Sequence, residues 1–354
     1  MNYKIVKIRS SPSVSRQRAI LIIYTGGTIG MVQDASGSLV PFNFMKVLEH
    51  IPELSKIEVG LTVISFPKPI DSSNVSIRDW QALGYIIYEN YDQYDGFVIL
   101  HGTDTMAYSA SALSFMLEGL AKPVIFTGAQ IPIGMLRSDA RENLITAIEI
   151  ATDQRNGSPF IKEVCIYFNL GLFRGNRSQK MRSSTFAAFD SQNYPLLAES
   201  GIDISYNEAA LATPNGLAPL RLHQDFDDNV AVLKIFPGIK EAVITSVLGI
   251  KNLKGLVIET FGSGNIPNEA WFIECLKKAV EDQIIVLNVS QCSGGDVIHG
   301  RYETSKKLSE IGIISGGNIT TESALTKLML LLGTKKSHEI IKNLLANPMN
   351  GEMD

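Results

Sequence analysis

Long hydrophobic runs are missing from this 354-residue chain, and so is a strong excess of charge of either sign. The apolar stretches, for example residues 19–24 and 284–289, are far shorter than the ~20 residues that a helix needs to cross a bilayer. We therefore expect no membrane-spanning segment. The formal net charge is -4 and the 32 lysines and arginines are scattered along the chain, which argues against a nucleic-acid partner.

Cysteine and histidine are also scarce, and their spacing does not suit metal binding. The three cysteines, Cys165, Cys275 and Cys292, form no CxxC pair, and the five histidines form no HxH or HxxxH pair. These spacings predict neither a disulfide scaffold nor a metal site, and we expect no cofactor. Residues 1–18 contain Pro12 and several serines but lack the apolar core of a secretory signal, so we expect a cytoplasmic location.

The chain has enough apolar residues for a large core, since 45% of its residues are hydrophobic. A single core rarely grows beyond ~250 residues, so two domains are predicted. Short β-branched runs alternate with amphipathic stretches, which is typical of an α/β fold made of parallel-sheet βα units. We predict a larger N-terminal domain over residues 18–210, a linker over 211–228 and a smaller C-terminal domain over 229–354.

Individual elements follow from the same patterns. Strands are predicted at residues 19–24, 61–66, 97–100, 123–127, 163–168, 230–235, 255–258 and 284–289. Helices are predicted at residues 77–91, 105–117, 138–152, 269–282, 302–311 and 321–332, with Ser138 as the cap of the third. Glycines and prolines interrupt the rhythm between residues 170 and 228, where we expect hairpins followed by the linker.

Two short loops rich in glycine and threonine stand out, because each follows directly on an apolar run. They are TGGTIG, residues 25–30, and HGTDTM, residues 101–106. The ends of strands in an open α/β sheet are where ligands bind, since hydroxyls and backbone amides converge there. TGGTIG lacks the features of a phosphate-binding P-loop and of a GxGxxG dinucleotide site, so its glycines favour close approach to a small ligand.

A threonine hydroxyl is the reactive group that these loops offer. A hydroxyl is a weak nucleophile and needs a neighbouring group to take its proton. Asp104, next to Thr103, could orient a base or bind a substrate ammonium, and a desolvated lysine can serve as the base. The hairpin region holds several cations, and the residue pattern does not choose among them: Arg174, Arg177, Lys180 and Arg182.

Each of these features also has a purely structural interpretation. A Gly-Gly turn after a strand is often only a turn, and Thr103 and Thr105 could simply cap the following helix. His101 taken alone fits a packed, hydrogen-bonded residue, and Lys180 taken alone fits a solvated surface charge. The functional interpretation therefore depends on the combination.

Taken together, the two loops resemble the two signature motifs of the bacterial-type L-asparaginase family. The likeness continues through residues 108–117, 123–130, 264–265 and 290–292, so that it covers nearly the whole chain, and it is strongest to the cytoplasmic, type I branch. Two motifs in the right order and separation are more specific than either motif alone.

The resemblance implies roles for individual residues. Thr28 would be the nucleophile that attacks the side-chain amide of L-asparagine, expels ammonia and leaves an acyl-enzyme for water to hydrolyse, whereas Thr25 would be structural. Thr103, Asp104 and Lys180 would form a companion triad in which the lysine supplies or accepts a proton.

The resemblance also implies a substrate-binding segment, Asp71, Ser72 and Ser73, whose hydroxyls would hold the α-carboxylate of the substrate. Asp104 would meet the α-ammonium group. Backbone amides of the glycine-rich loop are natural donors to the developing oxyanion.

The chain departs from the family pattern in the segment after TGGTIG. Many members carry a tyrosine there, on a mobile lid that activates the nucleophile, but residues 31–44 contain none. Ser38, Phe42 or a tyrosine from elsewhere is the candidate substitute, and the proton acceptor for Thr28 is left open. Gly30, Gly37 and the polar run 33–38 still predict a mobile segment.

A second departure concerns regulation. Some cytoplasmic members bind asparagine at an allosteric site near the segment that matches Ser290, Gln291 and Cys292, with help from an arginine whose counterpart is Glu259. A carboxylate at that position repels the carboxylate of the ligand. We therefore predict weak or absent activation by asparagine.

The resemblance thus predicts hydrolysis of L-asparagine to L-aspartate and ammonia. Secondary glutaminase activity is left open, because one methylene changes binding by only ~1 to 3 kcal/mol. The alternatives are an amino-acid-binding regulatory protein without turnover and an asparaginase-like subunit of an amidotransferase, for which an additional RNA-binding domain would be expected.

The resemblance also implies a homo-oligomer, a dimer or dimer of dimers, in which the C-terminal domain of one chain closes on its neighbour's site. The segment 264–265 suggests this arrangement.

Overall fold

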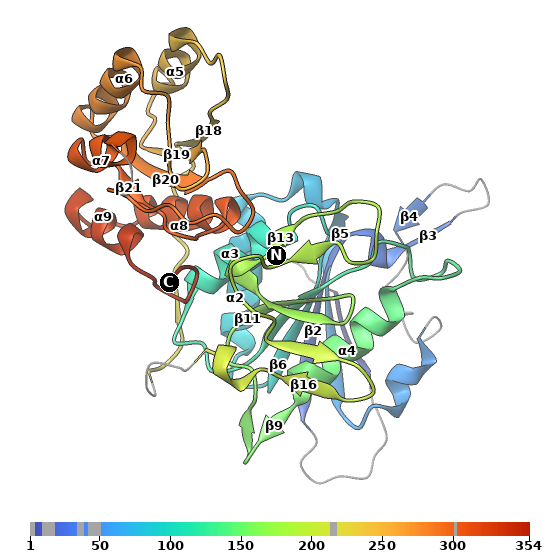
Figure 1. Ribbon diagram of the computed structural model, residues 1–354. Coiled ribbons are helices and arrows are strands. Elements are labelled where there is room, and N and C mark those ends of the chain that lie inside the picture. Colours follow the sequence, from blue (N-terminus) through green and yellow to red (C-terminus); the bar gives the residue numbers. More distant parts are fainter. Residues whose placement is uncertain (1–3, 9–17, 34–38, 42–50, 213–217, 301–302) are drawn as a thin grey trace. The chain divides into compact units, whose positions relative to one another are not determined.

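The protein divides into two compact units. The computed structural model describes residues 4–8, 18–33, 39–41, 51–212, 218–300 and 303–354. The large unit comprises Met1–Ser191 and Pro195–Leu222, and the small unit comprises Gln192–Tyr194 and His223–Asp354 (Figure 1). The break after Leu222 falls inside the segment 211–228, while the exact boundaries at residues 210 and 229 stay a prediction.

A mixed sheet forms the centre of the large unit. Within the described residues it has nine strands in the order β1-β5-β2-β6-β8-β11-β12-β15-β16. In that order they are β1 (Lys4–Ile8), β5 (Gly60–Ile70), β2 (Ala19–Gly26), β6 (Gly96–Leu100), β8 (Val124–Thr127), β11 (Val164–Phe168), β12 (Gly171–Arg174), β15 (Ala198–Ser200) and β16 (Ile204–Tyr206). The five strands from β5 to β11 run parallel, as predicted, and the predicted strands of this domain are all present.

The outer strands of this mainly parallel sheet are antiparallel to their neighbours. β1 pairs with β5, β12 with β11, β15 with β12 and β16 with β15, in each case antiparallel. Short turns join β11 to β12 and β15 to β16, within or next to the glycine-rich region after residue 170. The hairpins predicted for that region are therefore confirmed.

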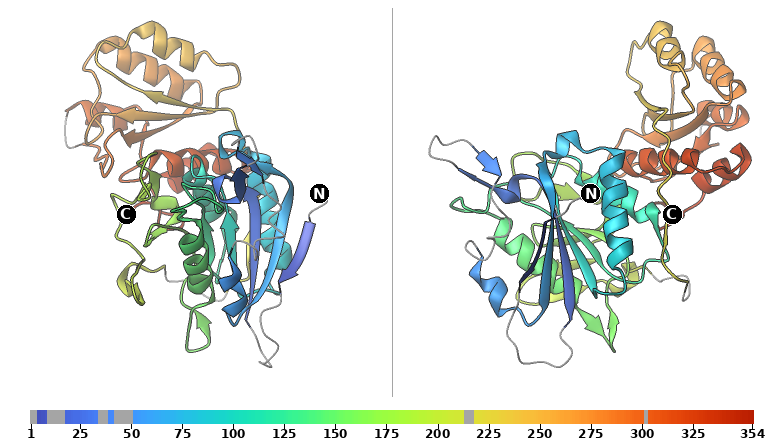
Figure 2. Two further views of the ribbon diagram at one scale, coloured as in Figure 1. Left: turned by 90° about the vertical axis from the view of Figure 1, so that its right-hand side faces the viewer. Right: turned by 180° about the vertical axis from the view of Figure 1, so that it is seen from behind.

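Among its described residues, the large unit has the helices α2 (Ile77–Asn90), α3 (Met106–Met116) and α4 (Ala140–Thr152). Figure 2 shows α2 and α4 on opposite faces of the sheet. Ser76 and Asp79 form a capping box at the start of α2, which explains why the helix begins at that point. Nearly every residue of α3 is buried, and its many small side chains, such as Ala110 and Ala112, suit close packing.

The start of α4 differs from the prediction that Ser138 is its cap. The helix begins at Ala140 and its N-cap is Asp139. The Ser138 hydroxyl still accepts a hydrogen bond from the Ala140 amide at 3.1 Å, but the Asp139 carboxylate is turned to the amides of Gln130 and Ile131. Asp139 therefore anchors the loop after β8 instead of capping its own helix.

The remaining short elements of the large unit form paired ribbons and single turns. The ribbons are β3 (Met31–Gln33) with β4 (Leu39–Pro41), β7 (Leu117–Glu118) with β17 (Arg221–Leu222), β9 (Gln154–Arg155) with β10 (Ser158–Pro159), and β13 (Gln179–Lys180) with β14 (Phe189–Asp190). The 3₁₀ turns are η1 (Thr28–Gly30), η3 (Pro52–Lys56), η4 (Ser72–Asn74), η5 (Gly175–Arg177) and η6 (Glu208–Ala210). The β7 and β17 pairing shows that part of the predicted linker is ordered on the large unit.

The small unit is a parallel four-stranded sheet covered by helices on both faces. Its strands are β18 (Val230–Lys234), β19 (Gly255–Thr260), β20 (Ile285–Ser290) and β21 (Ile314–Ser315), in that order. The helices in its described residues are α5 (Glu241–Leu248), α6 (Ala270–Glu281), α7 (Glu303–Glu310), α8 (Thr321–Gly333) and α9 (His338–Ala346). The predicted strands and three predicted helices are present, whereas α5, α9 and β21 were not predicted.

Side chains that alternate between the two faces of β19 and β20 divide the core of the small unit into two layers. Leu256, Ile258 and Val286 pack in one cluster with α6, while Val257 and Leu287 pack in the other with α8. Successive strand residues point to opposite faces, so a continuous apolar run fills both layers.

A buried ion pair secures the C-terminal segment of the small unit. Lys327 on α8 and Glu352 are both fully buried, and their charged groups are 2.6 Å apart. The Lys327 ammonium also donates to the carbonyl of Asn347 at 2.7 Å, and the Glu352 carboxylate accepts from the amides of Met349 and Asn350. Burial lowers the pKa of Lys327, and its carboxylate partner opposes that effect. This pair stands within a set of hydrogen bonds that satisfies both charges.

Candidate active site

The TGGTIG loop leaves the end of β2 and turns immediately. Its Gly27 amide donates to the Ile70 carbonyl at 3.2 Å, and the Gly30 amide donates back to the Gly27 carbonyl at 3.2 Å. Thr25 is buried and its hydroxyl donates to the carbonyl of Leu100 at 2.9 Å, so it joins β2 to β6 and has a structural position. Thr28 begins the turn η1 and is partly exposed, which leaves its hydroxyl accessible.

The two threonine loops touch through their glycines. Gly27 has a φ of +84°, and a Cβ placed there would lie 2.5 Å from the amide nitrogen of Gly102. A Cβ on Gly102 would in turn lie 2.5 Å from the Ser72 hydroxyl. A side chain on Gly27 would therefore collide with the backbone of the second loop, whereas a side chain on Gly102 would collide with Ser72. The loops of Thr28 and Thr103 are therefore brought together at neighbouring strand ends.

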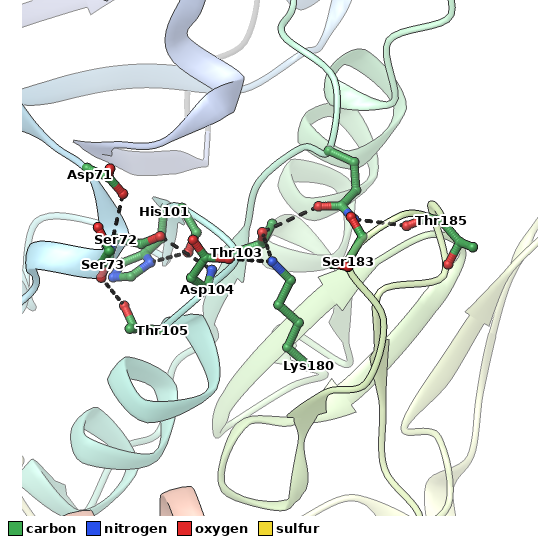
Figure 3. Close-up of polar contacts among 12 residues, drawn as sticks. Asp71, Ser72, Ser73, His101, Thr103, Asp104, Thr105, Lys180, Ser183 and Thr185 are labelled. Carbon is green, nitrogen blue, oxygen red and sulfur yellow. Dashed lines mark hydrogen bonds and ion pairs between the residues drawn. The ribbon is translucent and has the colours of Figure 1, made fainter.

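Lys180, Thr103 and Asp104 form a compact cluster, which Figure 3 shows from the side of the hairpin. The Lys180 ammonium donates to the Thr103 hydroxyl at 2.7 Å and to the Asp104 carboxylate at 2.6 Å. The Lys180 side chain is only 18% exposed, whereas the Asp104 side chain is 62% exposed. The interpretation of Lys180 as a solvated surface charge is therefore wrong.

The hairpin β13–β14 explains why Lys180 reaches Thr103, although the two residues lie 77 positions apart in the sequence. Two of the other cations that the sequence left open have different partners: Arg174 pairs with Glu163, and Arg182 donates to the carbonyl of Ala187. Lys180 is the candidate whose charged group contacts the Thr103 hydroxyl.

The segment Asp71, Ser72 and Ser73 lies beside this cluster at the end of β5. Ser72 is buried; its hydroxyl accepts from the Asp104 amide at 3.3 Å, and its carbonyl accepts from the Thr105 hydroxyl at 2.7 Å. Thr105 is the N-cap residue of α3, as the structural interpretation had it, but its side chain makes no cap hydrogen bond because its hydroxyl is turned to Ser72. Ser73 is exposed and its amide donates to Asp71.

His101 is packed beneath the cluster rather than directed into it. It is 2% exposed, its Nδ1 lies 2.7 Å from the Gly102 carbonyl, and its Nε2 lies 3.0 Å from the Ser109 hydroxyl. A carbonyl only accepts, so Nδ1 carries the proton and Nε2 accepts from Ser109, which in turn accepts from the Trp80 indole at 2.9 Å. Burial lowers the pKa of His101 to about 4, so the imidazole is neutral at pH 7.

Tyr24, at the end of β2, is the tyrosine nearest to Thr28 in the sequence. It is buried, its hydroxyl donates to the Gly30 carbonyl at 3.2 Å, and burial raises its pKa to about 12. Such a phenol secures the end of the loop but is a poor proton acceptor. The other candidates, Ser38 and Phe42, lie outside the described residues, and so do residues 34–38 of the predicted mobile segment. The described strands on either side of residues 34–38 pair with each other as the ribbon β3–β4.

The segment that matches the allosteric site lies at the end of β20 in the small unit. The Gln291 amide group donates to the carbonyls of Ile235 and Glu259 at 2.6 and 2.8 Å, and the Ser290 hydroxyl donates to Gly262 at 2.6 Å. Cys292 is an exposed free thiol.

Glu259 itself is occupied within the small unit. Its carboxylate accepts from the Thr321 hydroxyl at 2.7 Å and lies 3.5 Å from the Lys234 ammonium. The side chain is 16% exposed, so the carboxylate is largely enclosed by these partners. Its negative charge is therefore offset in part by the Lys234 ammonium.

Gln130 is a member of the cluster around Thr103 that the sequence analysis named only within a matching segment. Its side-chain oxygen accepts from the Thr103 hydroxyl at 3.3 Å. A glutamine after a strand carries no signal of its own, because only the folded arrangement brings it to Thr103.

The described residues contain neither a cluster of metal ligands nor a membrane-spanning helix. Among the described residues, no three His, Cys, Asp or Glu side chains gather as a metal site requires. No helix in those residues has the length and apolar character needed to span a membrane.

Comparison with known protein families identifies the class to which this fold and site belong. A family described as "Asparaginase, N-terminal" matches residues 19–212, and one described as "Glutaminase/Asparaginase C-terminal domain" matches residues 229–345. The chain therefore belongs to the asparaginase family, and the resemblance stated from its motifs is confirmed.

Individual relatives resemble the chain over nearly its full length. It is 40% identical over 340 residues to L-asparaginase 1 of Escherichia coli (strain K12), covering 96% of this chain and 98% of the relative. It is 39% identical over 365 residues to the 60 kDa lysophospholipase of Homo sapiens, covering 96% of this chain and 62% of that longer protein. The crystal structure of L-asparaginase I from Vibrio cholerae O1 biovar eltor str. N16961 superposes with a TM-score of 0.86 at 40% identity, covering 96% of this chain and 100% of the other.

Proposed function

We propose that this protein hydrolyses the side-chain amide of L-asparagine to L-aspartate and ammonia. The observation that carries the proposal is the contact of Lys180 with Thr103 and Asp104, beside the loop that presents Thr28. Membership of the asparaginase family and the likeness to L-asparaginase 1 support the same reaction.

In the proposed first step, the Thr28 hydroxyl oxygen attacks the amide carbon of the substrate. The C–N bond then breaks, and the hydroxyl proton leaves on the nitrogen as ammonia, so that an ester joins Thr28 to the aspartyl group. Water hydrolyses this ester and restores the hydroxyl. The amides of Gly27 and Gly30 already donate within the fold, so we propose the other amides of the glycine-rich loop as the oxyanion donors.

The companion cluster handles the proton and the charged end of the substrate. The Lys180 ammonium donates to the Thr103 oxygen at 2.7 Å, so it stabilises negative charge on that oxygen when the hydroxyl gives up its proton. The exposed carboxylate of Asp104 suits the α-ammonium group of asparagine, and Ser73, the exposed hydroxyl of its segment, suits the α-carboxylate. Ser72 holds the loop of Asp104 and Thr105 in place.

Ammonia release from L-asparagine tests this proposal, with Thr28→Ala and Thr103→Val as the variants. We expect each substitution to lower kcat by at least about a hundredfold, because each removes a group that takes part in bond making or proton transfer. Retained turnover in both variants would contradict the mechanism. Binding of L-aspartate without any ammonia release by the unmodified protein would support the amino-acid-binding alternative.

Two further substrates define the range of the activity. L-glutamine tests secondary glutaminase activity, and a lysophospholipid tests the activity that names the human relative. We propose L-asparagine as the preferred substrate. A higher kcat/KM for either of the other two would contradict that preference.

Regulation at the segment Ser290, Gln291 and Cys292 is proposed to be weak or absent. The Gln291 side chain is engaged with two backbone carbonyls, and a carboxylate, Glu259, stands where an arginine would pair with the ligand. We expect a hyperbolic dependence of rate on L-asparagine concentration. A sigmoidal curve that Cys292→Ala makes hyperbolic would contradict this proposal.

Assembly and location are proposed from family likeness and from the thiols. We propose a homo-oligomer, a dimer or dimer of dimers, which light scattering of the purified protein would test. A cytoplasmic location agrees with three free cysteines, because thiols stay reduced in that compartment. Cell fractionation would test the location.

A further inference from the structure

The position of Gln130 is fixed by its backbone. It follows β8, and its amide donates to both carboxylate oxygens of Asp139 at 3.1 and 3.0 Å. The next amide, of Ile131, donates to the same carboxylate at 3.0 Å. The side chain of Gln130 therefore starts from an anchored point at the base of α4.

The side chain of Gln130 joins Thr103 to the loop that follows Lys180. Its nitrogen donates to the carbonyls of Ser183 and Thr185 at 3.2 and 3.0 Å, and its oxygen accepts from the Thr103 hydroxyl at 3.3 Å (Figure 3). Two backbone carbonyls can only accept, so they fix which end of the amide faces them. The oxygen end is consequently turned to Thr103.

This orientation determines the direction of the hydrogen bonds at Thr103. The Thr103 hydroxyl has one proton, and an amide oxygen can only accept it. The Lys180 ammonium therefore donates to the Thr103 oxygen, at 2.7 Å, and the hydroxyl proton is directed to Gln130. With the side chain of Gln130 removed, the hydroxyl is free to turn and the Ser183 to Thr185 loop loses two hydrogen bonds.

We propose that Gln130 is a positioning residue of the reaction, which orients the Thr103 hydroxyl and holds the hairpin loop that presents Lys180. This inference rests on the proposed role of Thr103 and Lys180 in asparagine hydrolysis. Gln130 acts through Thr103, so its effect depends on the presence of that hydroxyl.

Kinetics of Gln130→Met test the inference, since methionine has a similar length but neither accepts nor donates a strong hydrogen bond. We expect kcat for ammonia release from L-asparagine to fall by about tenfold or more, with KM within about twofold and a changed pH profile of kcat. Gln130→Glu keeps the acceptor for Thr103 but cannot donate to the two carbonyls, and should lie between Gln130→Met and the unmodified protein. The exposed Gln93→Met is the matched control and should leave kcat unchanged.

A double-mutant cycle separates positioning from a general loss of structure. In a Thr103→Val background, Gln130→Met should change the residual rate by less than about twofold, because the hydroxyl through which it acts is gone. An equal fold-loss in both backgrounds, or unchanged kinetics of Gln130→Met, would overturn the inference. If Gln130→Met does not fold, the same cycle with Gln130→Glu decides the matter.

NMR of the Gln130 side chain, which does not depend on catalysis, tests the positioning role separately from the proposed function. The side-chain ¹⁵NH₂ signals of Gln130, identified by their loss in Gln130→Met, should exchange slowly with solvent and should shift in Thr103→Val. Slow exchange and this shift in a protein that releases no ammonia would overturn the function and leave the positioning intact. Fast exchange in an active protein would overturn the positioning alone.

Discussion

Acid should destabilise the large unit through one residue, His101. The imidazole is neutral and buried in the folded chain, held between the Gly102 carbonyl and the Ser109 hydroxyl. Protonation would give the ring a positive charge and a second N–H donor, at Nε2, which faces the Ser109 hydroxyl in a buried site. We therefore expect folding to resist protonation of this histidine.

The size of the effect follows from the two pKa values of His101. Burial lowers the pKa from its ordinary 6.5 to about 4 in the folded state. The unfolded chain takes up the proton first, so stability is complete above pH 6.5 and is lost as the pH falls towards 4. The total loss is about 3.4 kcal/mol, at about 1.4 kcal/mol for each pKa unit, and about 2 kcal/mol of it has occurred at pH 5.

Urea denaturation at pH 7.5 and pH 5 measures this loss. The chain has two tryptophans, so Trp271→Phe leaves Trp80 in α2 as the fluorescent reporter of the large unit. In that background, the fall in the free energy of unfolding between the two pH values should be about 2 kcal/mol smaller for His101→Asn than for His101. His338→Asn, which alters an exposed histidine, is the matched control.

Two results would refute the reasoning. One is the same pH dependence of stability with and without His101. The other is an NMR titration in which the folded His101 ring takes up its proton near pH 6.5, as an exposed imidazole does.

Three further outcomes follow from contacts described above. Gly27→Ala should lower the free energy of unfolding by about 3 kcal/mol or more in urea denaturation, because its Cβ would lie 2.5 Å from backbone. Gly157→Ala is the control: this residue has a φ of +78° and nothing within 4 Å of its Cβ position, so the substitution should cost only about 1 kcal/mol. Lys327→Met should cost about 3 to 5 kcal/mol by the same measurement, since it leaves Glu352 buried without its partner, and the pair Lys327→Met with Glu352→Gln should recover part of that loss. Tyr24→Phe should cost about 1 kcal/mol and lower kcat for ammonia release, and unchanged kcat would show that its hydroxyl does not hold the loop of Thr28.

The central sheet could be predicted because its strands are continuous apolar runs. Residues Ile20 to Tyr24 of β2 are buried on both faces, and this leaves a clear pattern in the sequence. β1 and β12 could not be placed in the same way, since antiparallel pairing at the edge depends on contacts with distant strands. The helices α5 and α9 were not predicted although α7, which is as short as α5, was, so length alone does not explain the difference.

The candidate site was only partly predictable. The motifs and the family resemblance identified Thr28, Thr103, Asp104 and Lys180, and the contacts among the last three agree with that grouping. The burial of Ser72 could not be foreseen, because it depends on a close approach to Gly102. Hydrogen-bond partners from distant parts of the chain leave no trace in local composition.

The contact of Gly27 with Gly102 has a consequence for motion. The two loops meet main chain to main chain, at the ends of strands that are hydrogen-bonded neighbours. No rotamer change can separate them, so they fluctuate as one rigid body on the timescale of side-chain motion. Any opening that admits a ligand to Thr28 and Thr103 must therefore come from segments that surround this pair of loops.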